Sequence, residues 1–88
     1  MYRLAIKKNL DRKFKKIQKK DKDMIRMIER KVQDVLDNPY RFKSLRKPLQ
    51  NKRRVHIHGS FVLIYEVSEE EKIVTLLDFD HHDTIYKS

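Results

Sequence analysis

The sequence has 88 residues, and we predict a single domain over residues 1–88. It contains no cysteine, which excludes disulfides and thiolate zinc sites and fits a cytoplasmic protein. The formal net charge is +9, from 22 Lys and Arg against 13 Asp and Glu. The longest apolar run, Phe61–Tyr65, is far shorter than the ~20 residues that span a bilayer, and no signal peptide is expected.

The charge is unevenly distributed along the chain. Residues 1–56 carry a balance of +14, whereas residues 57–88 carry −5. A basic excess gathered in one part of a chain is typical of a phosphate-binding surface, although a solvated basic face is the simpler interpretation. No predicted helix carries aromatic anchors opposite its Lys and Arg, so a membrane partner is not expected.

The first elements are a short strand and a helix. Tyr2–Ile6 alternates weakly in polarity and predicts the strand. Asn9 is the expected N-cap of a helix that runs to Lys20. Its apolar side chains follow the spacing of a narrow stripe that faces a core. These are Leu10, Phe14 and Ile17.

A second helix is expected over Lys22–Asp37. Asp21 or Asp23 is its expected N-cap. Asn38-Pro39 ends it, because the residue before proline is pushed out of the helical region. The apolar stripe of this helix is wider and comprises Ile25, Ile28, Val32, Val35 and Leu36.

A loop and a β-hairpin follow. Tyr40–Asn51, which holds Pro48, is the predicted loop. Two strands, Arg53–His58 and Phe61–Val67, flank Gly59-Ser60. Glycine at the first central position of a two-residue loop suits a type II′ turn.

The last predicted strand is Lys72–Phe79, after a polar turn at Glu69–Glu71, and Asp80–Ser88 is expected to form a tail. The resulting order is β-α-α-β-β-β. This order predicts an α+β domain in which two N-terminal helices pack on one side of a mostly antiparallel sheet.

The histidines lie on the predicted strands and tail. Alternation places Arg54, His56 and His58 on one strand face, and Val55 and Ile57 on the other, toward the helices. Satisfied surface side chains are the plain interpretation of the polar row.

A second histidine cluster, His81-His82-Asp83, precedes Tyr86. It converges with the first cluster if the last strand pairs beside the hairpin. Imidazole can move protons near neutral pH, as RNA cleavage requires at the attacking 2′-oxygen and the leaving 5′-oxygen.

Other chemistries are less well supported. The histidines together with Asp78, Asp80 and Asp83 show no diagnostic zinc spacing, so neither a metal nor a cofactor is expected. One glycine excludes a P-loop. Ser60 lies in a turn without the nucleophile elbow of a hydrolase.

Three motifs in order resemble the RelE/ParE superfamily of toxin–antitoxin toxins over nearly the whole chain, and most of all its RelE group, which includes YafQ and the archaeal RelE proteins. Lys47-Pro48-Leu49-Gln50 stands where YafQ-like members have H-P-L-Q. His56–Tyr65 is similar to their hairpin H-(I/V)-x-x-D-W-x-L-I-Y. His82–Tyr86 is similar to their closing H-x-x-L-F.

This resemblance implies a microbial-RNase-like fold and an mRNA endonuclease that acts in the ribosomal A site. The 2′-hydroxyl attacks phosphorus, giving a 2′,3′-cyclic phosphate or 3′-phosphate and a free 5′-hydroxyl. The implied partners are mRNA, the ribosome and an acidic, RelB-like antitoxin. Two alternatives remain, because fold does not fix function. One is a ParE-like toxin that inhibits DNA gyrase, and the other is a non-catalytic RNA-binding module.

The resemblance also implies roles for single residues. His82 falls on the proposed general acid, His56 or Lys47 contacts the phosphate or helps to deprotonate the 2′-hydroxyl, and Tyr86 positions the nucleotide. Val62 stands where RelE proper has a phosphate-stabilising arginine, so Arg54 or Lys47 is expected to replace it. Ser60 and Phe61 stand where YafQ-like members have aspartate and tryptophan. The expected RNA-binding residues are Arg46, Lys52, Arg53, Arg54, Ser60 and Phe61.

Overall fold

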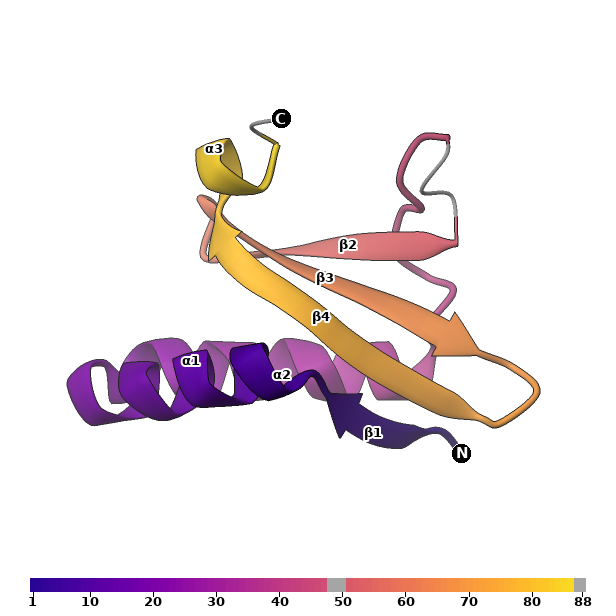
Figure 1. The fold of residues 1–88 in the computed structure, drawn as a ribbon, viewed down its shortest axis with the longest axis horizontal. Coiled ribbons are helices and arrows are strands. Elements are labelled where there is room, and N and C mark those ends of the chain that lie inside the picture. The colour runs from indigo at the N-terminus through magenta and orange to yellow at the C-terminus, as the bar shows by residue number, and fades with distance from the viewer. Residues whose placement is uncertain (48–50, 87–88) are drawn as a thin grey trace.

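Four strands form one sheet, and two long helices cover one face of it (Figure 1). The computed structural model describes residues 1–47 and 51–86. In chain order its elements are β1 (Arg3–Ile6), α1 (Lys8–Lys20), α2 (Lys22–Asp37), β2 (Lys52–Ile57), β3 (Phe61–Ser68), β4 (Ile73–His81) and α3 (His82–Ile85). The predicted α+β class and element order are confirmed, with α3 as an addition.

The strand order is β1-β4-β3-β2, so β4 lies between β1 and β3. The β2–β3 and β3–β4 pairs are antiparallel, whereas β1 runs parallel to β4. The expectation of a mostly antiparallel sheet is therefore confirmed. β1 pairs only with Ile73–Leu76, and α1 lies along the part of β4 that follows. This leaves the C-terminal end of β4 free to carry functional side chains.

The two long helices pack their apolar stripes against the sheet. Leu10 of α1 and Val35 of α2 are buried in the same core cluster as Leu63 of β3. Asp21 caps α2 as predicted, because its Oδ1 accepts a hydrogen bond of 3.0 Å from the backbone N of Met24. The prediction for Asn9 is wrong: α1 begins at Lys8, so Asn9 lies inside its first turn.

The hairpin differs from the predicted turn. Ile57 pairs with Phe61, so three residues rather than two connect β2 and β3. Both His58 and Gly59 have positive φ, 52° and 70°, whereas a type II′ turn needs it only at its first central residue. Glycine adopts such an angle without strain. His58 thus lies in the turn and not, as predicted, in the strand row.

β4 is longer than predicted and contains a bulge. Pairing with β3 continues to Phe61 opposite His81, so His81 belongs to the strand and not to a tail. Tyr65 pairs with Leu76 and Ile64 with Asp78, which leaves Leu77 as an extra residue. The inserted residue shifts the alternation of side chains, so Leu76 faces the helix-side core while Asp78, two residues later, faces the opposite side of the sheet.

The segment after α2 is tied to the sheet at several points. Tyr65 is fully buried and donates a hydrogen bond of 2.7 Å to the carbonyl of Pro39. Arg53 donates one of 2.7 Å to the carbonyl of Phe42. These bonds fix one wall of the groove described below. Pro48, predicted within this loop, lies outside the described residues, as do Leu49 and Gln50 of the same motif.

Candidate active site

A groove of about 840 Å³ lies between α3, the loop before β2 and the sheet. Its polar lining is mostly basic, and its apolar lining includes Ile64, Leu77 and Ile85. The full lining is Lys7, Lys43, Ser44, Leu45, Arg46, Lys52, Arg54, Ile64, Leu77, Asp78, His82, Ile85 and Tyr86. A groove with an apolar floor and cationic walls suits a nucleotide chain, since bases and phosphates need different surfaces.

Four side chains predicted to share a site come together here: Arg54, His82 and Tyr86 line the groove, and His56 lies beside His82 without being among the lining residues. The rings of His56 and His82 are roughly parallel, with centroids 6.1 Å apart. The His82 ring also meets Tyr86 edge to face at 4.7 Å. Nη1 of Arg54 donates a hydrogen bond of 2.7 Å to the Tyr86 hydroxyl. The two histidine clusters, one on β2 and one after β4, converge because β3 pairs with β2 on one side and with β4 on the other (Figure 1).

The short helix α3 positions His82 and Tyr86. His81 precedes it, and its Nδ1 accepts a hydrogen bond of 3.2 Å from the backbone N of Asp83. The backbone N of His82 donates one of 2.7 Å to the carbonyl of Ser60 in the hairpin turn. His82 begins α3 and Tyr86 directly follows it, four residues on, so both rings can face β2. His81 lies instead against Phe61, with ring centroids 5.6 Å apart.

The field of the groove favours an anion. Five basic side chains line it, and Asp78 is the one carboxylate among the lining residues. A cleft lined by one sign of charge concentrates ligands of the other sign. The basic lining residues are Lys7, Lys43, Arg46, Lys52 and Arg54.

The expected RNA-binding residues divide between the groove and other surfaces. Arg46, Lys52 and Arg54 line the groove. Arg53 points elsewhere, because its guanidinium hydrogen-bonds Phe42 and lies 5.0 Å from the Tyr40 ring centroid.

The remaining expected site residues lie outside the groove lining. Lys47 is exposed at the end of the first described segment and is not among the lining residues. Ser60 is exposed in the hairpin turn, where its carbonyl holds His82. Phe61 stacks on Phe79 at 5.4 Å, on the helix side of the sheet.

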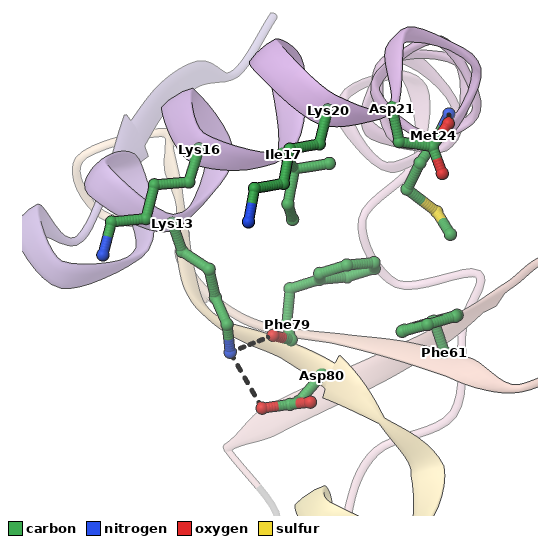
Figure 2. Close-up of a pocket in the computed structure, with 9 residues that line it drawn as sticks. All are labelled: Lys13, Lys16, Ile17, Lys20, Asp21, Met24, Phe61, Phe79 and Asp80. Carbon is green, nitrogen blue, oxygen red and sulfur yellow. Dashed lines mark hydrogen bonds and ion pairs between the residues drawn. The ribbon is translucent and has the colours of Figure 1, made fainter.

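A second pocket, of about 310 Å³, separates α1 and α2 from the ends of β3 and β4 (Figure 2). Ile17, Met24, Phe61 and Phe79 form its apolar surface. Lys13 reaches across its edge, and its Nζ donates to the Phe79 carbonyl at 2.6 Å and to Asp80 Oδ2 at 2.9 Å. This lysine lowers the pKa of Asp80 below its usual range, and it satisfies a carbonyl on the free edge of β4.

Sequence reasoning missed several groove residues. Lys7 follows β1, and Lys43 and Ser44 lie in the loop before β2, so only the sheet order brings them together. In the sequence, Asp78 stands out only as a potential metal ligand. The doublet Leu76-Leu77 breaks the alternation of the strand, and this was the one available signal of a bulge beside Asp78.

Two further observations concern metal binding and membrane crossing. Within residues 1–47 and 51–86, no three His, Asp or Glu side chains are grouped as ligands for a metal ion. Across the same residues, none of the helices has the length and apolar character needed to cross a membrane.

Comparison with known proteins identifies the family. The sequence profile described as "ParE toxin of type II toxin-antitoxin system, parDE" matches residues 2–86. A Methanocaldococcus jannaschii protein named "Putative toxin RelE4" is 45% identical over 87 residues, covering 99% of this chain and 93% of that protein. The chain therefore belongs to the RelE/ParE toxins of type II toxin–antitoxin systems, as its motifs predicted.

Solved structures agree on the fold. The YoeB/ParE toxin from Agrobacterium tumefaciens superposes with a TM-score of 0.81 at 14% identity, over 91% of this chain and 98% of that one. The toxin fold in the intact E. coli RelBE toxin–antitoxin complex gives 0.79 at 16% identity, over 92% and 96%. At such identities the likeness establishes the fold and leaves the chemistry to the site.

Proposed function

We propose that this toxin is an endoribonuclease, an mRNA interferase that cleaves mRNA in the A site of the ribosome and acts in the cytoplasm. The observation that carries the proposal is the cluster of His56, His82, Arg54 and Tyr86, of which the last three line a basic groove. Imidazoles supply proton transfer, the guanidinium supplies charge for a phosphate, and the phenol ring can position a nucleotide.

In the proposed reaction the 2′-hydroxyl of one nucleotide attacks the adjacent phosphorus, and the P–O5′ bond breaks. His82 donates a proton to the leaving 5′-oxygen. Its side chain is 48% exposed, so a substrate can reach it without rearrangement of the core. The products are a 2′,3′-cyclic phosphate, which can open to a 3′-phosphate, and a free 5′-hydroxyl.

Arg54 is the proposed phosphate stabiliser, in the role that an arginine at the position of Val62 has in RelE proper. Val62 is fully buried here and cannot contact a substrate. Arg54 lies in the neighbouring strand, lines the groove and already directs Nη1 toward Tyr86. Preorganised donors aimed at developing charge often contribute the largest single share of rate enhancement.

His56 is proposed to contact the scissile phosphate, because its ring lies beside that of His82. Lys47 keeps the same proposed role, although it is not among the groove-lining residues. Arg46 and Lys52 are proposed to bind flanking phosphates of mRNA or ribosomal RNA, contacts that position a strand without reading its sequence.

A cognate antitoxin is the proposed protein partner. The E. coli relative is described in a complex with its antitoxin. For this chain, with a net charge of +9, we propose an acidic, RelB-like protein that neutralises the toxin. Co-expression with the protein encoded beside it should yield a co-purifying complex without nuclease activity.

Toeprinting of a translated message tests the activity. Added protein should produce cuts within the codon in the A site, and the same RNA without ribosomes should remain largely intact. An unchanged toeprint with folded protein bound to ribosomes would contradict the nuclease and favour a non-catalytic RNA-binding module.

The second candidate is a ParE-like toxin that inhibits DNA gyrase. It is favoured by one observation, that the matching profile carries the ParE description. A supercoiling assay with purified gyrase distinguishes the two. Gyrase-dependent DNA breaks without cleavage of mRNA would replace the proposed activity by this one.

A further inference from the structure

We propose that Asp78 is the general base of the reaction and takes the proton from the attacking 2′-hydroxyl. This assignment rests on the proposed function, because it needs the same groove and the same chemistry. Asp78 is the only acidic residue among the groove-lining residues, and its side chain is 58% exposed. A carboxylate in a groove that otherwise favours phosphate weakens binding of the polyanion, so its presence calls for a chemical reason.

The bulge in β4 directs Asp78 to the groove. Leu76 pairs with Tyr65 and is buried in the core on the helix side. In a regular strand Asp78, two residues later, would share that face. Leu77 is inserted between the paired positions, so Asp78 falls opposite Ile64 and on the groove side. Bulges occur preferentially next to active sites, where they redirect a side chain.

Structural pairing does not account for Asp78. Lys13 is the basic residue nearest to it, at 3.9 Å, the outer limit of an ion pair. The same Nζ lies 2.9 Å from Asp80, which has the lowered pKa (Figure 2). Lys13 therefore has a close carboxylate partner already. Asp78 otherwise accepts a hydrogen bond from the backbone N of Phe79, which leaves its second oxygen for a substrate.

The position of Asp78 leaves room for a substrate between it and Arg54. Arg54, Ile64 and Asp78 occupy one row across β2, β3 and β4. With strands about 4.8 Å apart, the two ends of the row are on the order of 10 Å apart, which leaves room for a ribose and phosphate over Ile64. His82 contacts the Tyr86 ring, whose hydroxyl accepts the hydrogen bond from Arg54. The proposed base and the proposed acid thus both line the groove that holds the Arg54 guanidinium.

The proton balance closes without a cofactor. The Asp78 carboxylate takes the 2′-hydroxyl proton as O2′ forms its bond to phosphorus. The P–O5′ bond breaks, and the imidazolium of His82 gives its proton to O5′. Asp78 ends protonated and His82 neutral, and solvent restores both. His56 and Lys47 are then left to contact phosphate.

Single-turnover cleavage of ribosome-bound mRNA by Asp78 variants tests the assignment. Asp78→Asn should lower the rate roughly 10²–10⁴-fold, as expected for loss of a general base, with ribosome binding no weaker than that of wild type. Asp78→His should recover part of the rate, with a new loss of activity toward acid that sets in near neutral pH, where imidazole titrates. A purely structural role could not shift the pH profile in this way. Asp23→Asn removes an exposed carboxylate of α2 outside the groove lining, so it is the matched control and should leave the profile unchanged.

The outcomes separate the assignment from the proposed function. If the wild-type protein cleaves and Asp78→Asn cleaves at the same rate, Asp78 is not the base and the proposed function stands. If Asp78→His restores activity without changing the pH profile, the base lies elsewhere. If the folded wild-type protein does not cleave on the ribosome, the proposed function fails, and this assignment fails with it.

Discussion

Nη1 of Arg54 donates a hydrogen bond of 2.7 Å to the hydroxyl of Tyr86, and the same guanidinium lies 5.6 Å from the centre of the Tyr86 ring. This contact joins the middle of β2 to the end of α3. It holds the proposed phosphate-binding group and the proposed nucleotide-positioning ring in one unit, so their contributions to catalysis should not be independent.

A double-mutant cycle checks this coupling. Arg54→Gln should lower the single-turnover cleavage rate roughly 10²–10³-fold, since it removes the charge aimed at the phosphate. Tyr86→Phe should have a smaller effect, because the ring remains. The double variant should lose clearly less than the product of the two single losses. Fully multiplicative losses would mean that the contact has no role in the reaction.

His82 should be far more sensitive to substitution than its neighbour. His82→Ala should lower cleavage roughly 10²–10⁴-fold with folding and ribosome binding retained. His81→Ala should cost much less, because His81 packs on Phe61 and caps α3 without lining the groove. The reverse order of effects would place the acid on His81. Normal cleavage by both variants would exclude a histidine acid.

Tyr65 should make the fold sensitive to alkali. Burial raises the pKa of Tyr65 to about 12, from 10.0. The neutral phenol is the form that stabilises the fold, so its contribution is complete below pH 10 and is lost as pH rises toward 12. Tyr65→Phe should lower the urea midpoint at pH 8, since the Pro39 carbonyl loses its donor. The difference in urea midpoint between Tyr65→Phe and wild type should shrink by pH 12. As a control, Tyr86→Phe should lose stability in alkali to the same extent as wild type.

The Lys13–Asp80 pair should matter at neutral pH and not in acid. Lys13 holds the pKa of Asp80 below its usual range. The pair therefore stabilises the fold at pH values above the ordinary aspartate pKa, and this stabilisation is lost as pH falls through the lowered pKa. Asp80→Asn should cost up to about 1 kcal/mol of unfolding free energy at pH 7 and less in acid. Asp23→Asn removes a more exposed pair with Arg26 and should cost less. An NMR titration of Lys13→Met should show the Asp80 pKa rising toward its usual range.

Local patterns predicted most of the fold. The alternation of Val55 and Ile57 with Arg54 and His56 correctly separated buried from more exposed residues, because burial on one face imposes that pattern directly. The cap at Asp21 was predictable because it too is local: its hydrogen-bond partner, the backbone N of Met24, lies three residues away.

Long-range pairing explains what the sequence did not reveal. The polar run that follows Phe79 is typical of a tail, yet pairing with β3 extends the strand to His81. No local signal marks Lys7 or Lys43 as groove residues, since they meet only after β1 pairs with β4 and the loop closes over β2. Likewise, β1 pairs with β4, which lies far away in the sequence, and neither segment contains a local sequence signal that identifies the other as its partner.

The position of β4 also governs when the protein can become harmful. β4 is synthesised after the other three strands, yet it joins β1 to β3 and is followed by the helix that carries His82. A nascent chain that lacks it has a hairpin and two helices with no sheet to unite them. Such non-local pairing must wait until the distant segments are both available. The unit that joins Arg54 to His82 and Tyr86 therefore cannot assemble on a nascent chain until β4 is available to pair.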